Sequence, residues 1–211
     1  GVPGVAPAKV VVIGGGMVGT NAAQMALGLG ADVTVLDRSV DVLRRINAQF
    51  NGAVKAIYST ADALEQEVLA ADLVIGGVLV PGAAAPKLIT KDHIKRMKPG
   101  SAIVDVAIDQ GGCVETSKPT THAEPTYLVD DVVHYCVANM PGAVPRTSTF
   151  ALNNATLPFI LRLANKGYKQ ALLDDVHLMN GLNVMNGHVT NQSVAEALGF
   201  AFVEPKVALS A

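Results

Sequence analysis

A glycine-rich turn between two kinds of apolar segment restricts the fold of this chain more than any other feature. The run Lys9-Val10-Val11-Val12-Ile13 has the composition of a strand buried on both faces of a sheet. Gly14, Gly16 and Gly19 follow directly, and residues 21–29 are typical of a helix that ends at Gly30. In such a GxGxxG turn the first glycine permits a tight turn and the second lets the backbone approach a pyrophosphate. The third glycine lets the helix, whose N-terminus faces the phosphate charge, pack close to the strand.

Asp37 completes this pattern, because it ends the second apolar run, residues 33–36, 18 residues after Gly19. A carboxylate at that place can accept hydrogen bonds from ribose hydroxyls, so the segment predicts a dinucleotide site. A glycine cluster that binds no ligand is the alternative for the turn, and an N-cap is the alternative for Asp37. An acid here favours NAD over NADP, whereas Arg38 can accommodate a 2′-phosphate, which leaves that choice open.

Bulk properties exclude several classes of partner. Half of the 211 residues are hydrophobic, the net charge is −2, and no basic cluster is present, which argues against nucleic acid and anionic membranes. The longest apolar stretch, around 73–81, is far shorter than the roughly 20 residues of a membrane helix. Cys113 and Cys136 lack any ligand spacing, so we expect buried thiols in a reducing compartment, the cytoplasm.

Strand and helix patterns alternate along most of the chain. Strands are expected at 9–13, 33–36, 54–58, 73–75, 102–106 and 132–137, with helices at 21–29, 40–50, 61–70 and 91–98. This alternation predicts an α/β fold with a mostly parallel, doubly wound sheet of the Rossmann type. We expect a linker over 1–8, a dinucleotide-binding domain over 9–145, and a helical C-terminal segment over 146–211 that completes a second, substrate-binding domain.

The C-terminal segment has a different pattern. Helices are expected at 149–166, kinked at Pro158, and at 168–173 and 191–198. About 60 residues are too few for an independent domain of comfortable stability. We expect them to complete another domain or an oligomer interface, with Phe159, Leu163 and Leu172 exposed. The linker-like start and this segment favour a piece of a longer protein.

Ligands of doubly wound sheets bind beyond the carboxyl ends of the strands, so the residues there are candidates. Ser59 can meet the adenosine end of a dinucleotide or cap the next helix. Val78 and Leu79 can form an apolar wall or simply pack. Asp109, beside two glycines, can bind the nicotinamide ribose, handle a proton, or serve as a turn residue. Asn139 can hold a carboxamide or form a turn.

Histidines and metal-ligand patterns give no further site. His93, His122, His134, His177 and His188 show no pairing with serine, cysteine or an acid in sequence, and we expect packed or solvated side chains. No spacing typical of a metal site is present, and no nucleophile motif such as GxSxG.

Four segments resemble L-alanine dehydrogenases and the related nicotinamide nucleotide transhydrogenase alpha subunits. They are 11–23 (VVIGGGMVGTNAA), 71–82 (ADLVIGGVLVPG), 104–113 (VDVAIDQGGC) and 135–142 (YCVANMPG). The last three favour alanine dehydrogenase, and the similarity covers essentially the whole chain. The resemblance implies reversible oxidative deamination of L-alanine to pyruvate and ammonium with NAD, in a homo-oligomer, a hexamer. A transhydrogenase alpha-type subunit and a non-catalytic NAD-binding module are the alternatives.

The resemblance also implies the roles of individual residues. It marks Asp109 as the active-site aspartate. It implies cofactor contacts at Met17, Val18, Asp37, Ser59, Val78, Leu79, Val106, Ala107, Ile108, Asp109, Val137, Ala138, Asn139 and Met140. The arginine, lysine and histidine that handle the substrate in the family lie N-terminal to this domain and have no match here. Arg162 and Lys166 stand where some members carry a metal-binding Glu and His, so we expect no metal there.

Overall fold

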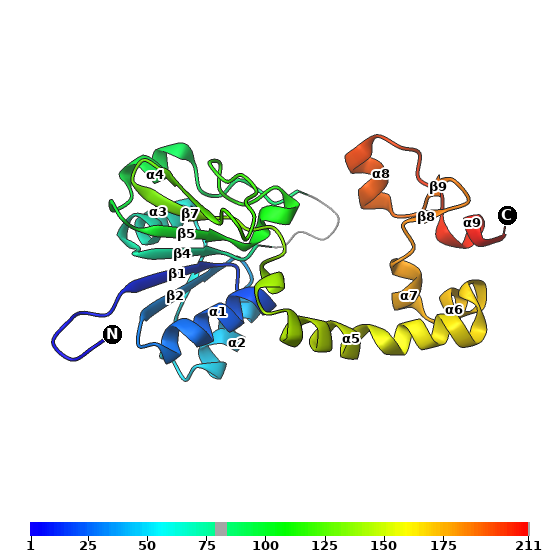
Figure 1. Ribbon diagram of the computed structural model, residues 1–211, viewed down its shortest axis with the longest axis horizontal. Coiled ribbons are helices and arrows are strands. Elements are labelled where there is room, and N and C mark those ends of the chain that lie inside the picture. Colours follow the sequence, from blue (N-terminus) through cyan, green and yellow to red (C-terminus); the bar gives the residue numbers. More distant parts are fainter. Residues whose placement is uncertain (79–83, 211) are drawn as a thin grey trace. The chain divides into compact units, whose positions relative to one another are not determined.

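The computed structural model describes residues 1–78 and 84–210. The chain divides into two compact units, one ending at Met140 and one starting at Pro141, and each is treated by itself (Figure 1).

A seven-stranded sheet is the centre of the first unit. Its strands are β1 (Lys9–Ile13), β2 (Asp32–Asp37), β3 (Lys55–Tyr58), β4 (Leu73–Gly76), β5 (Ala102–Asp105), β6 (Thr126–Val129) and β7 (Val132–Tyr135). Their order is β3-β2-β1-β4-β5-β7-β6, and only β6, at one edge, is antiparallel to its neighbour. The expected doubly wound α/β fold is therefore confirmed. The strand order reverses between β1 and β4, where Ile13 pairs with Gly76, and ligands of such sheets bind at this switch point.

Helices cover both faces of the sheet, because alternate side chains of each strand point to opposite faces. They are α1 (Met17–Gly28), α2 (Val40–Gln49), α3 (Ala61–Ala70) and α4 (Lys91–Arg96). On one face Val10 and Val12 pack in a cluster that includes Ala23 of α1 and Ile46 of α2. On the other face Val11 packs in a cluster with residues of α3 and α4 (Figure 1). Leu64 and Val68 of α3 belong to that second cluster, and the partly buried Leu69 packs against it.

Three details of the first unit differ from the expectations. Helix α1 begins at Met17, because the glycine turn leads straight into it without intervening loop residues. The fifth strand ends at Asp105, and the 3-10 helix η1 (Val106–Gln110) follows. Strand β6 was not expected, although Asp130 and Asp131 form a two-residue turn with φ of 49° and 61° between it and β7. Aspartate tolerates this left-handed backbone, so the pair was a usable hairpin signal.

The second unit consists of short elements around one long helix. These are α5 (Pro145–Lys166), α6 (Tyr168–Asp174), α7 (Val176–Asn180), β8 (Val184–Met185), β9 (His188–Val189), α8 (Gln192–Leu198) and α9 (Pro205–Ser210), preceded by the 3-10 helix η2 (Met140–Ala143). The α7 and α9 helices and the β8–β9 hairpin were not expected, since segments this short carry little periodicity. Leu172 is buried in a cluster with Met179 and Leu209, so its expected exposure was wrong.

Helix α5 is continuous through Pro158 and contains no buried residue. Phe159 is exposed, as expected, and Leu163 is half-buried. None of the helices in the described ranges is long and apolar enough to cross a lipid bilayer.

Candidate functional site

The carboxyl ends of the six parallel strands meet at one edge of the sheet, and each predicted site residue of the first unit lies in the segment that follows one of them. The structure therefore brings together the glycine turn after β1, Asp37 at the end of β2, Ser59 after β3, Val78 after β4, η1 after β5 and the 137–140 segment after β7. Leu79 lies outside the described residues.

Packing explains two of the three motif glycines, Gly14 and Gly19, but not the third, Gly16. Gly14 has φ of +96°, and a Cβ there would lie 2.9 Å from the Gly77 carbonyl oxygen. A Cβ on Gly19 would lie 1.8 Å from the Gly14 carbonyl oxygen, so helix and turn could not pack this closely with any other residue. A Cβ on Gly16, in contrast, would meet nothing within 4 Å. No packing within the described part of the protein requires glycine at this position, whereas close approach of a ligand would require it.

The N-terminus of α1 is free to meet an anion. Gly16 is its N-cap residue, no side chain caps it, and its first turn contains no acidic residue. Met17 is 81% exposed and Val18 is 42% exposed, so this end is not covered by other described residues. Backbone N–H groups at such an end, together with the helix dipole, favour a phosphate group. The glycine turn and the N-terminus of α1 therefore fit the pyrophosphate of a dinucleotide.

The Asp37 carboxylate is held against the glycine turn. Its Oδ2 accepts a hydrogen bond from the Gly15 backbone N–H at 2.7 Å, and its Oδ1 accepts one from the Ser39 N–H at 2.8 Å. The side chain that caps α2 is Ser39, which accepts from the Val42 N–H. The N-cap alternative for Asp37 is therefore wrong. Arg38 is exposed beside it.

The Gly15 carbonyl is fixed from two other elements. Thr20 Oγ1 in α1 donates to it at 3.1 Å, and Arg45 Nη2 in α2 donates to it at 2.9 Å. A Cβ on Gly15 would approach Val42 Cγ1 to 2.6 Å. Arg45 is a residue that sequence reasoning missed, because its place opposite the turn depends on how α2 packs.

Ser59 and Val78 lie where the sequence places them. Ser59 is half-buried, and its N–H donates to the Asp37 carbonyl oxygen at 3.0 Å. The N-cap of α3 is Thr60, so the capping alternative for Ser59 is wrong. Val78 is half-buried and packs against the core cluster on the α3 and α4 face.

Asp109 is presented at the surface by η1. Ala107 and Ile108 are buried and anchor this short helix, Val106 is half-buried, and Asp109 is exposed. The carboxylate of Asp109 has no hydrogen-bond or ion-pair partner among residues 1–78 and 84–210. It is therefore available to a ligand.

Asp105, which sequence reasoning passed over, is fully buried at the end of β5. Its carboxylate accepts hydrogen bonds from the backbone N–H groups of Cys113 and Val114, both at 3.2 Å, and from Ser117 Oγ at 2.6 Å. The signal that could have found it is a lone acid closing an apolar strand, since buried acids need partners.

The segment after β7 combines buried and exposed residues. Val137 is buried, whereas Ala138 and Asn139 are exposed and Met140 is half-buried. Asn139 has φ of 59°, a left-handed backbone, and its carbonyl oxygen lies 3.1 Å from His122 Nε2. The backbone of Asn139 is thus that of a turn residue, and its side chain is at the surface.

The buried titratable groups of the first unit have structural environments. The Nδ1 atom of His134 lies 3.0 Å from the Val132 carbonyl oxygen, and its Nε2 atom lies 2.7 Å from Thr116 Oγ1. Desolvation lowers the pKa of His134. His134 is therefore a packed histidine, as expected. Cys113 and Cys136 are free, buried thiols, and burial raises the pKa of Cys113, which keeps it protonated.

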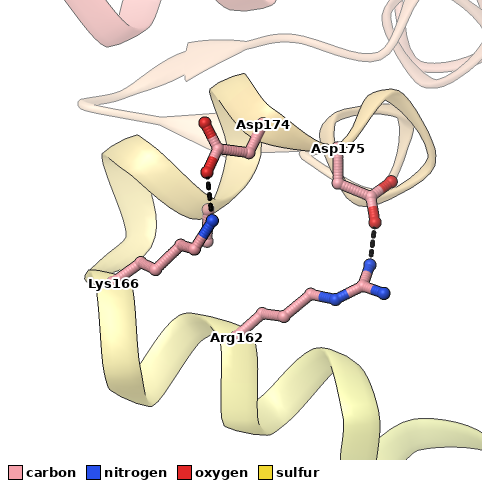
Figure 2. A pocket seen from close by; sticks show the side chains of 5 residues that line it. Arg162, Lys166, Asp174 and Asp175 are labelled. Atoms are coloured by element: carbon pink, nitrogen blue, oxygen red, sulfur yellow. Dashed lines mark hydrogen bonds and ion pairs between the residues drawn. The ribbon is translucent and has the colours of Figure 1, made fainter.

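A separate polar pocket of about 330 Å³ lies within the second unit. Figure 2 shows Arg162 and Lys166 of α5 pointing toward Asp175 and Asp174, with which they form ion pairs. These contacts join the end of α5 to α6 and α7. The pocket contains none of the predicted cofactor residues.

Sequence comparisons connect the chain to one family. A family model described as alanine dehydrogenase/PNT, C-terminal domain, matches residues 1–192. The alanine dehydrogenase of Halomonas elongata is 68% identical over 204 residues, which are 97% of this chain and 55% of that protein. Alanine dehydrogenase 2 of Staphylococcus aureus is 58% identical over 210 residues, 99% of this chain and 56% of that protein. The chain thus spans about half the length of the curated relatives it matches.

Solved structures agree with the sequence matches. An L-alanine dehydrogenase structure superposes with a TM-score of 0.86 at 52% identity, covering 94% of this chain and 55% of that one. A transhydrogenase from Sinorhizobium meliloti gives a TM-score of 0.62 at 28% identity, over 69% of this chain and 42% of that one.

Proposed function

This chain belongs to the alanine dehydrogenase/PNT C-terminal domain family, and from that premise we propose that it is the NAD-binding part of an L-alanine dehydrogenase. The proposed reaction is the reversible oxidative deamination of L-alanine to pyruvate and ammonium. One observation of the structure carries the cofactor assignment. Gly16 lies at the uncapped N-terminus of α1, and no described residue fills the space beside it. A Cβ would fit there without a clash, so packing does not explain the glycine.

The phosphate end of the cofactor follows from the glycine turn. We assign the pyrophosphate to Gly14, Gly16, Met17, Val18 and Gly19, because backbone N–H groups of the turn and helix end favour negative charge. Asp37 then accepts hydrogen bonds from the adenosine ribose, and its negative charge disfavours the 2′-phosphate of NADP. The exposed cation of Arg38 works against that discrimination, so the preference for NAD over NADP rests on Asp37.

We assign further cofactor contacts to the segments that follow the other parallel strands. They are Ser59, Val78, Val106, Ala107, Ile108, Asp109, Val137, Ala138, Asn139 and Met140. Leu79, which lies outside the described residues, is proposed as a contact from the sequence alone. Ala107 and Val137 are buried, so their packing keeps the backbone of their segments in place. Asn139, with its exposed amide, is suited to hold a carboxamide.

Asp109 is the proposed active-site acid. When bound, NAD supplies the acceptor for the hydride that leaves the amino acid. An exposed carboxylate without a partner among the described residues can orient a cationic amine or hold a proton beside the reacting carbon. We assign the groups that hold the substrate carboxylate to the part of the relatives that this chain does not match.

Partners and location follow from the same premise. We propose small-molecule substrates, L-alanine and pyruvate, a homo-oligomeric enzyme, a hexamer, and a cytoplasmic location.

A direct test is alanine-dependent reduction of NAD by the natural full-length protein, followed by absorbance of NADH. The proposal predicts turnover with L-alanine and the reverse reaction with pyruvate and ammonium. Binding of NADH without any turnover would favour a non-catalytic module. Hydride transfer to NADP through a membrane partner, without action on alanine, would favour the transhydrogenase alternative. Either outcome would contradict the proposal.

A further inference from the structure

The turn that follows Asp109 is held from two sides by groups of opposite charge. We define the 111–114 turn as Gly111 to Val114. Its N–H side faces the buried carboxylate of Asp105, which accepts from the Cys113 and Val114 N–H groups, both at 3.2 Å. Among the described residues Asp105 has no cationic partner, so these N–H groups, the Cys113 thiol and the Ser117 hydroxyl stabilise its charge.

The carbonyl side of the same turn faces the Lys87 ammonium. Lys87 Nζ donates to the carbonyl oxygens of Gly111, Gly112 and Val114, the second at 2.9 Å and the third at 3.3 Å. The backbone around Lys87 is itself attached to the turn region. The Ala85 N–H donates to the Gln110 carbonyl oxygen and the Leu88 N–H to the Cys113 carbonyl oxygen. Lys87 therefore stands on a fixed segment, and its charge is directed at the turn.

Steric constraints leave the turn little freedom to rearrange. Gly112 has φ of +76°, and a Cβ there would lie 2.6 Å from Asp105 Oδ2. Gly111, with φ of 88°, ends η1, the helix that carries Asp109 two residues earlier. The backbone of Asp109 thus leads directly into the 111–114 turn. The N–H groups of this turn point toward Asp105, and its carbonyl groups point toward Lys87.

We propose that Lys87 and Asp105 are positioning residues that fix η1, and with it the carboxylate of Asp109, through the 111–114 turn. This inference rests on the proposed function for the role of Asp109. An ammonium has three N–H donors, and all three have carbonyl partners here. Lys87 is therefore occupied as a structural cation and is not free to bind the substrate carboxylate.

The variant that tests this proposal is Lys87→Met, which keeps the length of the side chain and removes the charge. Lys87 is exposed, so the protein is expected to fold. Lys55→Met is the matched control, because Lys55 pairs with Asp32 at the opposite, amino end of the strands. Lys87→Arg restores a cationic donor and should recover part of any loss.

Two measurements on residues 1–211 test whether Lys87 fixes η1. Hydrogen exchange should become faster in peptides that cover 106–117 for Lys87→Met, and not for Lys55→Met. The dissociation constant of NADH, followed by its fluorescence, should rise by about three- to tenfold for Lys87→Met. In the natural full-length protein, Lys87→Met should lower kcat for alanine oxidation more than it changes KM for alanine.

The outcomes separate the positioning role from the proposed function. Unchanged local exchange and unchanged NADH affinity in Lys87→Met would overturn the positioning role, even if thermal stability fell. Failure of the wild-type chain to bind NADH would overturn the proposed function, and the exchange measurement would still decide whether Lys87 fixes the turn. Asp105→Asn should also speed exchange in 106–117, and if that variant does not fold, Lys87→Met alone is decisive.

Discussion

The carboxylate of Asp37 and the backbone N–H of Gly15 are joined by a hydrogen bond of 2.7 Å. This contact connects the end of β2 to the middle of the glycine turn, 22 residues earlier. The other oxygen of Asp37 accepts from the Ser39 N–H, so the carboxylate is oriented within the chain itself. An ionised carboxylate has about four acceptor positions, and two of them are used here. Asp37 therefore keeps acceptor capacity for a ribose.

We predict that Asp37→Ala weakens NADH binding by about 10- to 100-fold, because hydrogen bonds to a charged group contribute roughly 1.5–3 kcal/mol. The preference for NADH over NADPH should fall as well, since the negative charge is lost. Ser39→Ala is the control, because it removes the cap of α2 and leaves the carboxylate. Titration of both variants with NADH and NADPH checks this, and equal NADH affinity in wild type and Asp37→Ala would refute the ribose assignment.

Gly16 and Gly28 provide a matched pair for the phosphate site. Both belong to α1 or its N-cap, and a Cβ at either would meet nothing within 4 Å. Both Gly16→Ala and Gly28→Ala should therefore fold. Gly28→Ala should melt no lower than the wild type, and Gly16→Ala should lose at most about 1 kcal/mol, because alanine is a poorer N-cap residue than glycine. Only Gly16→Ala should weaken NADH binding, by tenfold or more, because its methyl group occupies the space assigned to the pyrophosphate. Equal affinities of the two variants would place the phosphates elsewhere.

Gly19→Ala should behave differently from both. Its Cβ would lie 1.8 Å from the Gly14 carbonyl oxygen, so helix and turn must separate. We expect a loss of stability of about 1–3 kcal/mol or more, the order seen for overpacked cores, measurable by urea unfolding. A melting temperature equal to that of Gly28→Ala would contradict the packing described.

Asp109→Asn tests the acid at η1. The substitution keeps the shape of the side chain and removes its charge, so NADH binding should persist while alanine oxidation by the natural full-length protein falls by about 100-fold or more, the scale of general acid–base catalysis. If kcat stays near the wild-type value, Asp109 is a turn residue without a catalytic role.

His134 predicts a pH dependence of stability. Its folded pKa lies below the ordinary value of 6.5, chiefly because burial disfavours the charged ring. Below that value the unfolded chain binds the proton more readily, so the free energy of unfolding falls as the pH drops, by at most about 1.4 kcal/mol per pH unit. Urea unfolding between pH 7.5 and 5 measures the slope. His134→Gln should flatten it, and an unchanged slope would show that another group titrates in this range.

The sequence predicts the parallel part of the sheet well because long β-branched runs such as 9–13 and the glycine turn are strong local signals. It fails for β6 and for the short elements after α6, whose few residues are fixed by contacts distant in sequence. The burial of Leu172 is an example, because it depends on Leu209 from the last helix.

For the site, sequence position identifies which residues lie at the carboxyl edge of the sheet, since that edge follows from parallel topology. It does not identify the residues that hold them there. Arg45 reaches the glycine turn because of how α2 packs. Lys87 and Asp105 contact the 111–114 turn, Lys87 from the 84–89 segment and Asp105 from the end of β5. A spacing rule for one strand and one turn contains no information about such partners.

Dinucleotide binding is tested most directly by titrating residues 1–211 with NADH and following the fluorescence of the nicotinamide. The titration is carried out with the wild type, Gly16→Ala and Gly28→Ala. We predict saturable binding to the wild type and to Gly28→Ala, and binding at least tenfold weaker to Gly16→Ala. Absence of binding to the folded wild-type chain, or equal binding by all three proteins, would contradict the assignment of this domain as a dinucleotide-binding unit.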